Sequence, residues 1–400
     1  MSANVRVTRT VRLPDPLRVE RYLRVPELGP RILFFSGGTA LRDLSRQLKF
    51  YTHNSIHLIS PFDSGGSSAK LRDAFGMLSV GDLRNRLMAL ADESVRGNPE
   101  IYELFSYRFP EDVASTELDR RLEEMIAGKD SRIASIPQPM QRIIRVNLRH
   151  FADRMPSGFD LSGASIGNLV LAGGYLETDR DIESVVFLFS QLVEVRGVVR
   201  TVADVDLQLA CELEDGTLLI GQHLVTGKEV APITSPIRDM YLVARSDPGA
   251  PAQASVHPRV ARLISNADLI CYPIGSFYSS ILANLLPTGI GSTIASAQCP
   301  KVYIPNAGPK TDPEQLGMGV GDCVETLIRF VRRDAGADID AAQILDLVLI
   351  DPRQMPNFDR DDRERIEKLG VSVAEADMMI DSEDTRHDAD KLAEILLSLA

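Results

Sequence analysis

The sequence has few cysteines, and none of them forms a close pair. Cys211, Cys271, Cys299 and Cys323 are widely separated along the 400 residues. This spacing excludes a CxxC zinc site and a disulfide framework. We therefore interpret the thiols as buried groups of a protein that stays in a reducing, cytoplasmic compartment.

Long apolar runs and an excess of positive charge are also missing. No uninterrupted apolar stretch approaches the length of a membrane span, and the Arg-rich segment 1–24 lacks the apolar core of a secretory signal. The formal net charge of −12 argues against non-specific binding to nucleic acid or to an anionic membrane. We expect a cytoplasmic protein with no nucleic-acid or membrane partner, although a local basic pocket for phosphate is compatible with this charge.

Several common catalytic signatures are absent. No Gly-Lys-Ser/Thr sequence follows a Gly-rich loop, which excludes a P-loop, and the G-x-G-x-x-G spacing of a dinucleotide site is missing. The six histidines are scattered and none belongs to an HExxH motif, which disfavours a zinc hydrolase. We expect no zinc, no haem and no permanently bound flavin, and a dinucleotide dehydrogenase is disfavoured.

What the sequence does contain is a series of units in which an apolar strand, a loop and a helix follow one another. The loops of the first two units are Ser36-Gly37-Gly38-Thr39 after the run 32–35 and Asp63-Ser64-Gly65-Gly66-Ser67-Ser68 after the run 56–59. A third loop, Gly81-Asp82-Leu83-Arg84-Asn85, opens another helix. Glycines let the backbone approach a ligand, and a helix N-terminus presents free N–H groups to an anion. In open parallel sheets such loops lie where ligands bind. A tight turn is the alternative for a Gly-Gly pair considered alone.

Two later loops repeat this pattern. In Gly163–Leu169, small residues with Ser165 and Asn168 lead into an apolar helix, for which close helix packing is the alternative interpretation. The strand 267–272 is followed by Gly275 and Ser276, and the helix predicted over 277–286 carries Tyr278 and Ser280 in its first turn. A further strand, 301–304, ends near Asn306.

These units predict an α/β fold with a Rossmann-like, doubly wound, mostly parallel sheet. We interpret residues 1–28 as an N-terminal extension of extended or irregular structure, 29–334 as the nucleotide-binding core, and 335–400 as a C-terminal α/β completion and tail. Within the core, 94–156 is predicted to be a helical insertion, with a cap over the sheet as one interpretation. The Asp215-Gly216 turn signal predicts a small antiparallel β-unit over 200–245.

Oxygen-bearing side chains in these loops are candidate Mg²⁺ ligands, because this ion prefers hard oxygen donors and commonly bridges phosphates. The candidates are Asp63, Asp82 and Asn306, and the cations that could neutralise a diphosphate are Lys70, Arg72 and Arg84. Other roles stay open. Asp63 is also a good turn residue, Asp82 a good helix N-cap, and Lys70 and Arg72 are compatible with a solvated helix face.

Taken together, a set of short blocks between Arg31 and about Arg332 forms a specific pattern. Besides the loops above, the blocks are Arg86 to Asp92, Leu104 to Phe109, Gly163 to Leu169, Arg196 to Val199, Glu212 to Thr217, Ala267 to Ile270, Gly275 to Ser280, Asn284 to Leu286 and Pro300 to Ile304. Each block alone is weak. Because the blocks occur together in this order, the chain resembles the CofD/YvcK family. The resemblance is to a divergent branch whose motifs are nearer those of YvcK.

The resemblance implies a Rossmann-like, usually dimeric protein that binds a nucleotide-linked diphosphate at the strand ends. CofD proteins use magnesium to transfer a phospholactyl-type group from a GDP-linked donor to a deazaflavin, with release of GMP. YvcK proteins bind UDP-sugars and act in carbon metabolism and cell-envelope control. We therefore expect Mg²⁺, a GDP- or UDP-linked small molecule and a homodimer.

The expected site combines the loops with the resemblance. Catalytic roles are assigned to Asp63, Asp82 and Arg84, with Asp63 as the metal ligand. The expected nucleotide-binding residues are Ser36, Gly37, Gly38, Thr39, Ser64, Gly65, Gly66, Ser67, Ser68, Arg72, Asn85, Ser165, Asn168, Gly275, Ser276, Tyr278, Ser280 and Asn306.

This sequence departs from the family pattern at three positions. Ser64 stands where a second acid is usual, Ala164 where a histidine is usual, and Ile274 lies within the late Gly-rich loop. Two functions follow. The first is a CofD-like transferase that moves a phosphate-linked group to an acceptor and releases a nucleoside monophosphate. The alternative is a YvcK-like, non-catalytic regulator that binds a UDP-sugar.

Overall fold

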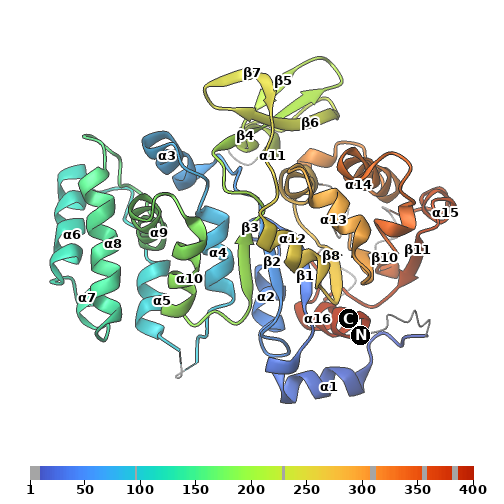
Figure 1. Cartoon of the computed structure of the whole chain (residues 1–400), viewed down its shortest axis with the longest axis horizontal. Coiled ribbons are helices and arrows are strands. Elements are labelled where there is room, and N and C mark those ends of the chain that lie inside the picture. Colours follow the sequence, from blue (N-terminus) through green and yellow to red (C-terminus); the bar gives the residue numbers. More distant parts are fainter. Residues whose placement is uncertain (1–9, 95–96, 228–229, 307–311, 354–357, 381–385) are drawn as a thin grey trace.

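The computed structural model describes residues 10–94, 97–227, 230–306, 312–353, 358–380 and 386–400. Within these residues, seven parallel strands form one sheet in the order β11-β10-β9-β8-β1-β2-β3 (Figure 1). The strands are β1 (Ile32–Ser36), β2 (Ile56–Ile59), β3 (Val198–Thr201), β8 (Leu269–Tyr272), β9 (Lys301–Tyr303), β10 (Leu347–Ile350) and β11 (Ser372–Glu375). The predicted Rossmann-like fold is confirmed.

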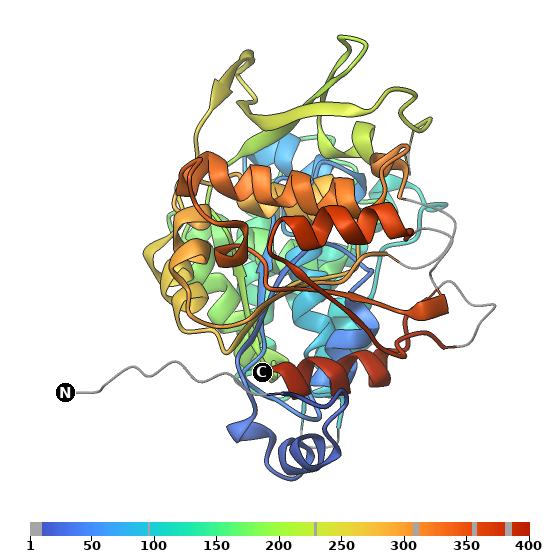
Figure 2. The same ribbon diagram turned by 90° about the vertical axis from the view of Figure 1, so that its right-hand side faces the viewer.

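Helices cover both faces of this sheet. Successive side chains of a strand point to opposite faces. In β1, Ile32 and Phe34 pack with α2 (Arg42–Leu48) and α16 (Ala389–Leu399), whereas Leu33 and Phe35 pack with helices of the other face. Those helices are α12 (Pro258–Ser265), α13 (Ile290–Ser296), α14 (Val320–Ala335) and α15 (Arg360–Lys368). Figure 2 shows α14 and α15 above the strands and α16 below them, so the sheet is doubly wound.

A helical unit lies beyond the β3 edge of the sheet (Figure 1). Its helices are α3 (Gly66–Phe75), α4 (Gly81–Ala89), α5 (Pro99–Ser106), α6 (Ser115–Ala127), α7 (Ser131–Ala134), α8 (Met140–Arg154), α9 (Ile166–Glu177) and α10 (Ile182–Leu192). They share one apolar core, in which Phe105, Phe151 and Phe189 are fully buried. The segment predicted as an insertion, 94–156, supplies α5 to α8, and these helices extend the molecule sideways rather than covering the sheet.

A second, four-stranded antiparallel sheet lies at the top of the molecule in Figure 1, in the order β5-β4-β6-β7. Its strands are β4 (Leu207–Leu213), β5 (Leu218–Ile220), β6 (Ile237–Ala244) and β7 (Asp247–Ala252), and α11 (Gln222–Thr226) lies between β5 and β6. The predicted β-unit therefore exists, but its boundaries are shifted. Arg200 and Thr201 belong instead to β3, where they pair in parallel with Leu58 and Ile59 of β2.

The N-terminal segment was expected to be irregular, and this expectation is wrong for residues 16–28. Helix α1 (Pro16–Arg24) is followed by a 3₁₀ turn (Pro26–Leu28). The Asp15 side chain caps α1, and Arg18 Nη1 donates to the backbone oxygens of Ser398 and Ala400, each at 2.8 Å. Docking against the end of α16 thus stabilises a helix whose own sequence gives a weak signal.

The segment 277–286 was expected to be one α-helix, and it is instead a π-turn (Phe277–Ile281) followed by a 3₁₀ segment (Leu282–Leu285). The buried Glu314 carboxylate caps the start of this segment, because its Oε2 accepts the backbone N–H groups of Tyr278 at 2.9 Å and Ser279 at 2.8 Å. Two other 3₁₀ turns are Pro313–Gln315 and Ala341–Gln343. Across the described ranges, no helix has the length and apolarity that crossing a bilayer requires.

Candidate functional site at the strand ends

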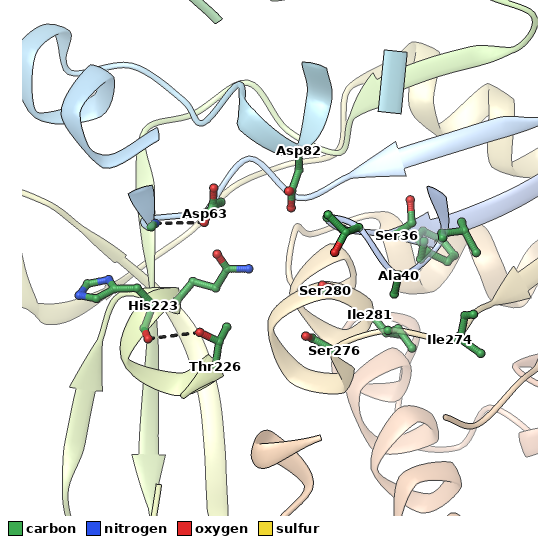
Figure 3. Close-up of a pocket in the computed structure, with 18 residues that line it drawn as sticks. Ser36, Ala40, Asp63, Asp82, His223, Thr226, Ile274, Ser276, Ser280 and Ile281 are labelled. Atoms are coloured by element: carbon green, nitrogen blue, oxygen red, sulfur yellow. Dashed lines mark hydrogen bonds between the residues drawn. The ribbon is translucent and has the colours of Figure 1, made fainter. Parts of the chain in front are cut away.

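The strand order places a crevice at the carboxyl end of β1. From β1 the chain proceeds to β2 and β3 on one side, and later returns to β8 on the other side. Open α/β sheets bind ligands where the strand order reverses in this way. A cavity of about 290 Å³ lies at this position. It is lined by the loop after β1, the loop and π-turn after β8, the residues Asp63, Gly65 and Asp82, and α11 (Figure 3).

Close packing at Gly37 and Gly38 builds one wall of this first cavity. A Cβ atom at Gly37 would lie 2.3 Å from Ser280 Oγ, and a Cβ atom at Gly38 would lie 3.1 Å from Asp82 Oδ1. The first distance is shorter than real side-chain contacts permit. Only glycine therefore allows the β1 loop, the π-turn and the start of α4 to meet here.

Arg86 holds this loop from behind. Its side chain is 1% exposed, and its Nη atoms donate to the carbonyl oxygens of Leu41 at 2.9 Å, Gly37 at 3.0 Å and Gly38 at 3.3 Å. Burial lowers the pKa of Arg86 to about 10, and the Asp82 carboxylate opposes that effect. Because the loop carbonyls are occupied by Arg86, Arg86 fixes the conformation of the loop that lines the cavity.

Asp63 and Asp82 are the acidic residues of the first cavity. Figure 3 shows Asp63 in the loop after β2 and Asp82 projecting from the start of α4. Asp63 Oδ1 accepts the Gly65 N–H at 3.1 Å, and Asp63 Oδ2 would lie 3.5 Å from a Cβ atom at Gly81. The turn role foreseen for Asp63 therefore exists, and its second oxygen faces the start of α4.

This donor set is compatible with Mg²⁺. The ion is commonly held in proteins by one or two carboxylates, and phosphates and waters complete its shell. Two carboxylates border the same cavity here, and hydroxyls of Ser36, Ser276 and Ser280 lie around it. The described ranges contain no cluster of three or more His, Cys, Asp or Glu side chains that would form an all-protein metal cage.

Helix α11 brings the antiparallel sheet to the first cavity. It contributes Gln222, His223 and Thr226 to the lining, opposite Ser276 and Ser280 (Figure 3). His223 Nδ1 lies 2.9 Å from the hydroxyl of Ser64, the residue that replaces the usual acid of the family pattern. The imidazole points away from Ser280, and the Ser64 contact fixes α11 to the loop after β2.

A second cavity of about 470 Å³ adjoins the first and shares Asp63, Gly65 and Asp82 with it. It lies between the strand-end loops and the helical unit. Its other lining residues are Gly66, Ser67, Ser68, Lys70, Gly81, Arg84, Asn85, Arg108, Glu111, Ser162, Gly163 and Asn168. The two carboxylates thus stand at the boundary between an α11-covered cavity and a cavity that faces the helical unit.

Most of the predicted site residues line one of these cavities. Those at the first cavity are Ser36, Gly37, Gly38, Thr39, Gly275, Ser276 and Ser280. Those at the second are Gly66, Ser67, Ser68, Arg84, Asn85 and Asn168, while Asp63, Gly65 and Asp82 belong to both. The structure therefore gathers residues from sequence positions 36 to 280 along one continuous surface.

Four of the predicted residues have their side chains engaged elsewhere. Arg72 is fully buried and bonds the backbone oxygens of Phe62 and Asp63 as well as Asp206. Asn306 Oδ1 accepts the Gly275 backbone N–H, and Asn306 Nδ2 donates to the Gly275 backbone oxygen, each at 2.8 Å. The remaining two, Tyr278 and Ser165, donate their hydroxyls to the Ile237 and Phe105 backbone oxygens.

Ser165 is also the middle residue of Gly163-Ala164-Ser165-Ile166-Gly167, which matches the letters of a serine-hydrolase elbow. Such an elbow exposes its serine at the end of a strand beside a histidine. Ser165 is instead fully buried at the start of α9, and its hydroxyl donates to the Phe105 backbone oxygen. The match is therefore coincidental.

Sequence reasoning missed Arg86 and the α11 residues Gln222, His223 and Thr226. Arg86 lies four residues after Asp82 on α4, so its position on the same helix face could have been read from the spacing. Helix α11 is only five residues long, and its relation to the cavity depends on the contact between Ser64 and His223. No local pattern reports such a contact.

The chain is similar to several known proteins. The Listeria monocytogenes protein named gluconeogenesis factor is 27% identical over 386 residues, covering 93% of this chain and 96% of its own. The Bacillus subtilis protein of the same name is 28% identical over 385 residues, covering 92% and 98%. A crystal structure of a UPF0052 family member from Bacillus halodurans has the same fold, with a TM-score of 0.65 at 24% identity over 92% of this chain and 99% of that one.

The family model described as 2-phospho-L-lactate transferase CofD matches residues 32–379. This match runs from the first strand of the parallel sheet to beyond its last strand, β11, and includes every residue of both cavities. The chain therefore belongs to the 2-phospho-L-lactate transferase CofD family.

Proposed function

We propose that this protein binds a nucleoside diphosphate-linked small molecule, together with Mg²⁺, in the first cavity. The observation that carries the proposal is the meeting of Gly37, Asp82 and Ser280 at the point where the strand order reverses. Backbone N–H groups of a Gly-rich loop and serine hydroxyls suit phosphate oxygens. The Asp63 and Asp82 carboxylates suit the ion, which would neutralise the charge of the diphosphate.

Within this proposal, the reaction class that fits a CofD-like protein is transfer of the phosphate-linked group. An acceptor oxygen would bond to the phosphorus distal to the nucleoside, and the bond from that phosphorus to the bridging oxygen would break. The nucleoside monophosphate leaves with the bridging oxygen, and the acceptor hydroxyl gives up its proton. The chain's contribution is to orient the diphosphate against the Gly37–Gly38 loop and to exclude water with α11.

A second function is a regulator that binds the nucleotide-linked molecule without transforming it. The observation that favours it is the name gluconeogenesis factor carried by the relatives from Listeria monocytogenes and Bacillus subtilis. The replacement of the usual second acid by Ser64, which contacts His223, also supports this function. A YvcK-like protein of this kind would respond to a UDP-sugar through α11 and the antiparallel sheet.

One experiment separates these functions. Purified protein and Mg²⁺ are incubated with GDP- and UDP-linked donors, with and without a deazaflavin acceptor, and nucleoside monophosphate is quantified by chromatography. Binding of each donor is titrated in the same samples. Release that requires both donor and acceptor supports the transferase, whereas donor-specific binding without release supports the regulator. Absence of binding by every nucleotide-linked donor would contradict the proposal itself.

A further inference from the structure

The second cavity is surrounded by helix N-termini. Helices α3, α4 and α9 all begin beside it, and none of the three has a side-chain N-cap hydrogen bond among the described residues. The first N–H groups of each helix lack partners within the helix, and each helix dipole places partial positive charge at this end. The first N–H group of α9, that of Ile166, donates to the Tyr107 backbone oxygen at 3.0 Å, so α3 and α4 are the helices whose first N–H groups make this wall electropositive.

Arg84 adds a buried cation to this wall. The residue is only 7% exposed, and its aliphatic stem packs against Gly167 of α9, where a Cβ atom would lie 3.1 Å from Arg84 Cγ. Throughout the described ranges, the one hydrogen bond of the Arg84 side chain is from Nε to Asn168 Oδ1 at 3.3 Å. Its two Nη groups are left to face the cavity that it lines.

A second arginine, Arg108, lies on the same cavity. Its Nη1 donates to the Gly163 backbone oxygen at 2.9 Å, and neither Arg84 nor Arg108 forms an ion pair in the described part of the chain. Burial, together with the positive charges of Arg108 and Arg42, lowers the pKa of Arg84 to about 10, and the charge of Asp82 opposes this effect. Lys70 differs, because Asp160 neutralises it at 2.6 Å.

Two arginines without ion-pair partners in the described residues, beside the N-termini of α3 and α4, form an arrangement that an anion would stabilise. The acids of this cavity, Asp63, Asp82 and Glu111, do not neutralise them by direct pairing. A buried guanidinium with free Nη groups is a bidentate donor suited to a carboxylate or a phosphate. Retaining such a group without a ligand costs free energy, because a buried charge needs compensation.

We propose that the second cavity binds the carboxylate or phosphate of a small acid, held by Arg84, Arg108 and the first N–H groups of α3 and α4. The site rests on the proposed function in one respect: it would place the acid across the Asp63–Asp82 boundary from the nucleotide. The acid is either a separate small molecule or the acidic end of the group that the nucleotide carries. Both sources present the same anion to the same arginines.

The test uses inorganic phosphate as the probe and equilibrium dialysis of the full chain. Binding is measured for the wild type, for Arg108→Gln and for Arg84→Gln, with and without saturating GDP or UDP. Phosphate is expected to bind in the presence of the nucleotide, and Arg108→Gln is expected to weaken it by about tenfold because a charge-assisted donor is lost. Arg142→Gln, at an exposed position on α8, is the matched control and keeps wild-type affinity.

Two further ligands identify the source of the acid. For a uridine-binding site, UDP-glucuronate carries an acidic group and UDP-glucose does not. If UDP-glucuronate displaces phosphate and UDP-glucose does not, the acid belongs to the nucleotide-linked group. Retention of phosphate with both ligands means that the acid is a separate molecule. Each of these two results supports the site.

Three results would overturn the inference. The first is that phosphate does not bind, and the second is that plain GDP or UDP displaces phosphate completely. The third is that Arg108→Gln and Arg84→Gln are both folded and both keep the wild-type affinity for phosphate. This test is distinct from that of the proposed function. A protein that binds phosphate in the second cavity but binds no nucleotide would contradict nucleotide binding in the first cavity and would leave the acid site supported. Circular dichroism of both arginine variants confirms that they are folded.

Discussion

The Ser64 hydroxyl lies 2.9 Å from Nδ1 of His223, and this contact joins the loop after β2 to α11. The backbone N–H of His223 also donates to Ser64 Oγ, at 3.3 Å. One serine therefore connects the parallel sheet to the antiparallel sheet at the edge of the first cavity. In our account, it determines where Gln222 and Thr226 stand relative to a ligand.

Ser64→Ala should weaken ligand binding without unfolding the protein. Removing both contacts frees α11, and a hydrogen bond of this kind contributes about 1 kcal/mol, which corresponds to about a fivefold loss of affinity. Calorimetric titration of the preferred nucleotide measures this change. Ser296→Ala, an exposed position on α13 whose hydroxyl bonds only its own helix, serves as the control. Wild-type affinity in Ser64→Ala would show that the contact does not position α11.

Gly37→Ala should abolish nucleotide binding, because its Cβ atom would lie 2.3 Å from Ser280 Oγ and 2.8 Å from Ser280 Cβ. The added atom forces the β1 loop and the π-turn apart. The double variant Gly37→Ala with Ser280→Gly removes the obstructing atoms and should restore part of the affinity. Gly249→Ala on β7 meets only an ordinary contact of 3.6 Å and should have no effect. A failure of rescue would indicate that the Ser280 hydroxyl itself contacts the ligand.

Arg72→Lys should destabilise the fold by roughly 3 kcal/mol, because one ammonium cannot replace a fully buried guanidinium that bonds several acceptors. Those acceptors include the Phe62 and Asp63 backbone oxygens and the Asp206 carboxylate, 2.7 Å away. Urea unfolding measures the loss, with Arg149→Lys on α8 as the surface control. Full stability combined with lost nucleotide affinity would instead support the phosphate contact first expected for Arg72.

Acidification should destabilise the protein through His57. Burial, and to a lesser degree the charge of Arg86, hold the pKa of His57 well below its usual range. The unfolded chain binds a proton near pH 6.5 and the folded chain does not, so stability falls as pH decreases below 6.5. The slope for one such histidine reaches about 1.4 kcal/mol per pH unit.

His57→Phe removes this proton and keeps the stacking on Phe34, where the ring centroids lie 5.1 Å apart. Between pH 6.5 and 5.5, the variant should therefore lose less stability than the wild type in urea unfolding. His387, whose pKa burial lowers to about 4, contributes equally to both proteins and cancels from the difference. Parallel stability curves for the two proteins would show that His57 takes up its proton in the folded state.

The sequence was sufficient to predict a parallel sheet, without its edge strands β3 and β11, and most of the loops that line both cavities. Apolar runs such as Ile32 to Phe35 are buried on both faces, and this pattern is local. The strand-end position of Asp63 followed from the same pattern, and the position of Asp82 at a helix start followed from the loop that precedes α4. The sequence therefore predicted most of the residues that line the cavities. It did not predict that these residues are divided between two cavities.

What the sequence could not reveal depends on contacts between distant segments. The start of the π-turn at Phe277–Ile281 is capped by Glu314, which accepts the N–H groups of Tyr278 and Ser279 from more than thirty residues away. Arg72 was expected at a phosphate or on a solvated helix face. Its guanidinium is instead buried and bonds the Asp206 carboxylate and nearby backbone oxygens. Strand β11 was missed because Ser372–Glu375 carries little β-signal, and pairing with β10 forms it.

The most direct test of the account is the magnesium dependence of nucleotide binding in Asp63→Asn. The amide keeps an oxygen for the Gly65 N–H, so the loop can retain its turn while the carboxylate charge is lost. Titrations with and without Mg²⁺ should show that the ion strengthens binding to the wild type and to the exposed control Asp119→Asn. They should show no strengthening in Asp63→Asn. Equal enhancement by Mg²⁺ in all three proteins would contradict a magnesium-assisted nucleotide site at the strand ends.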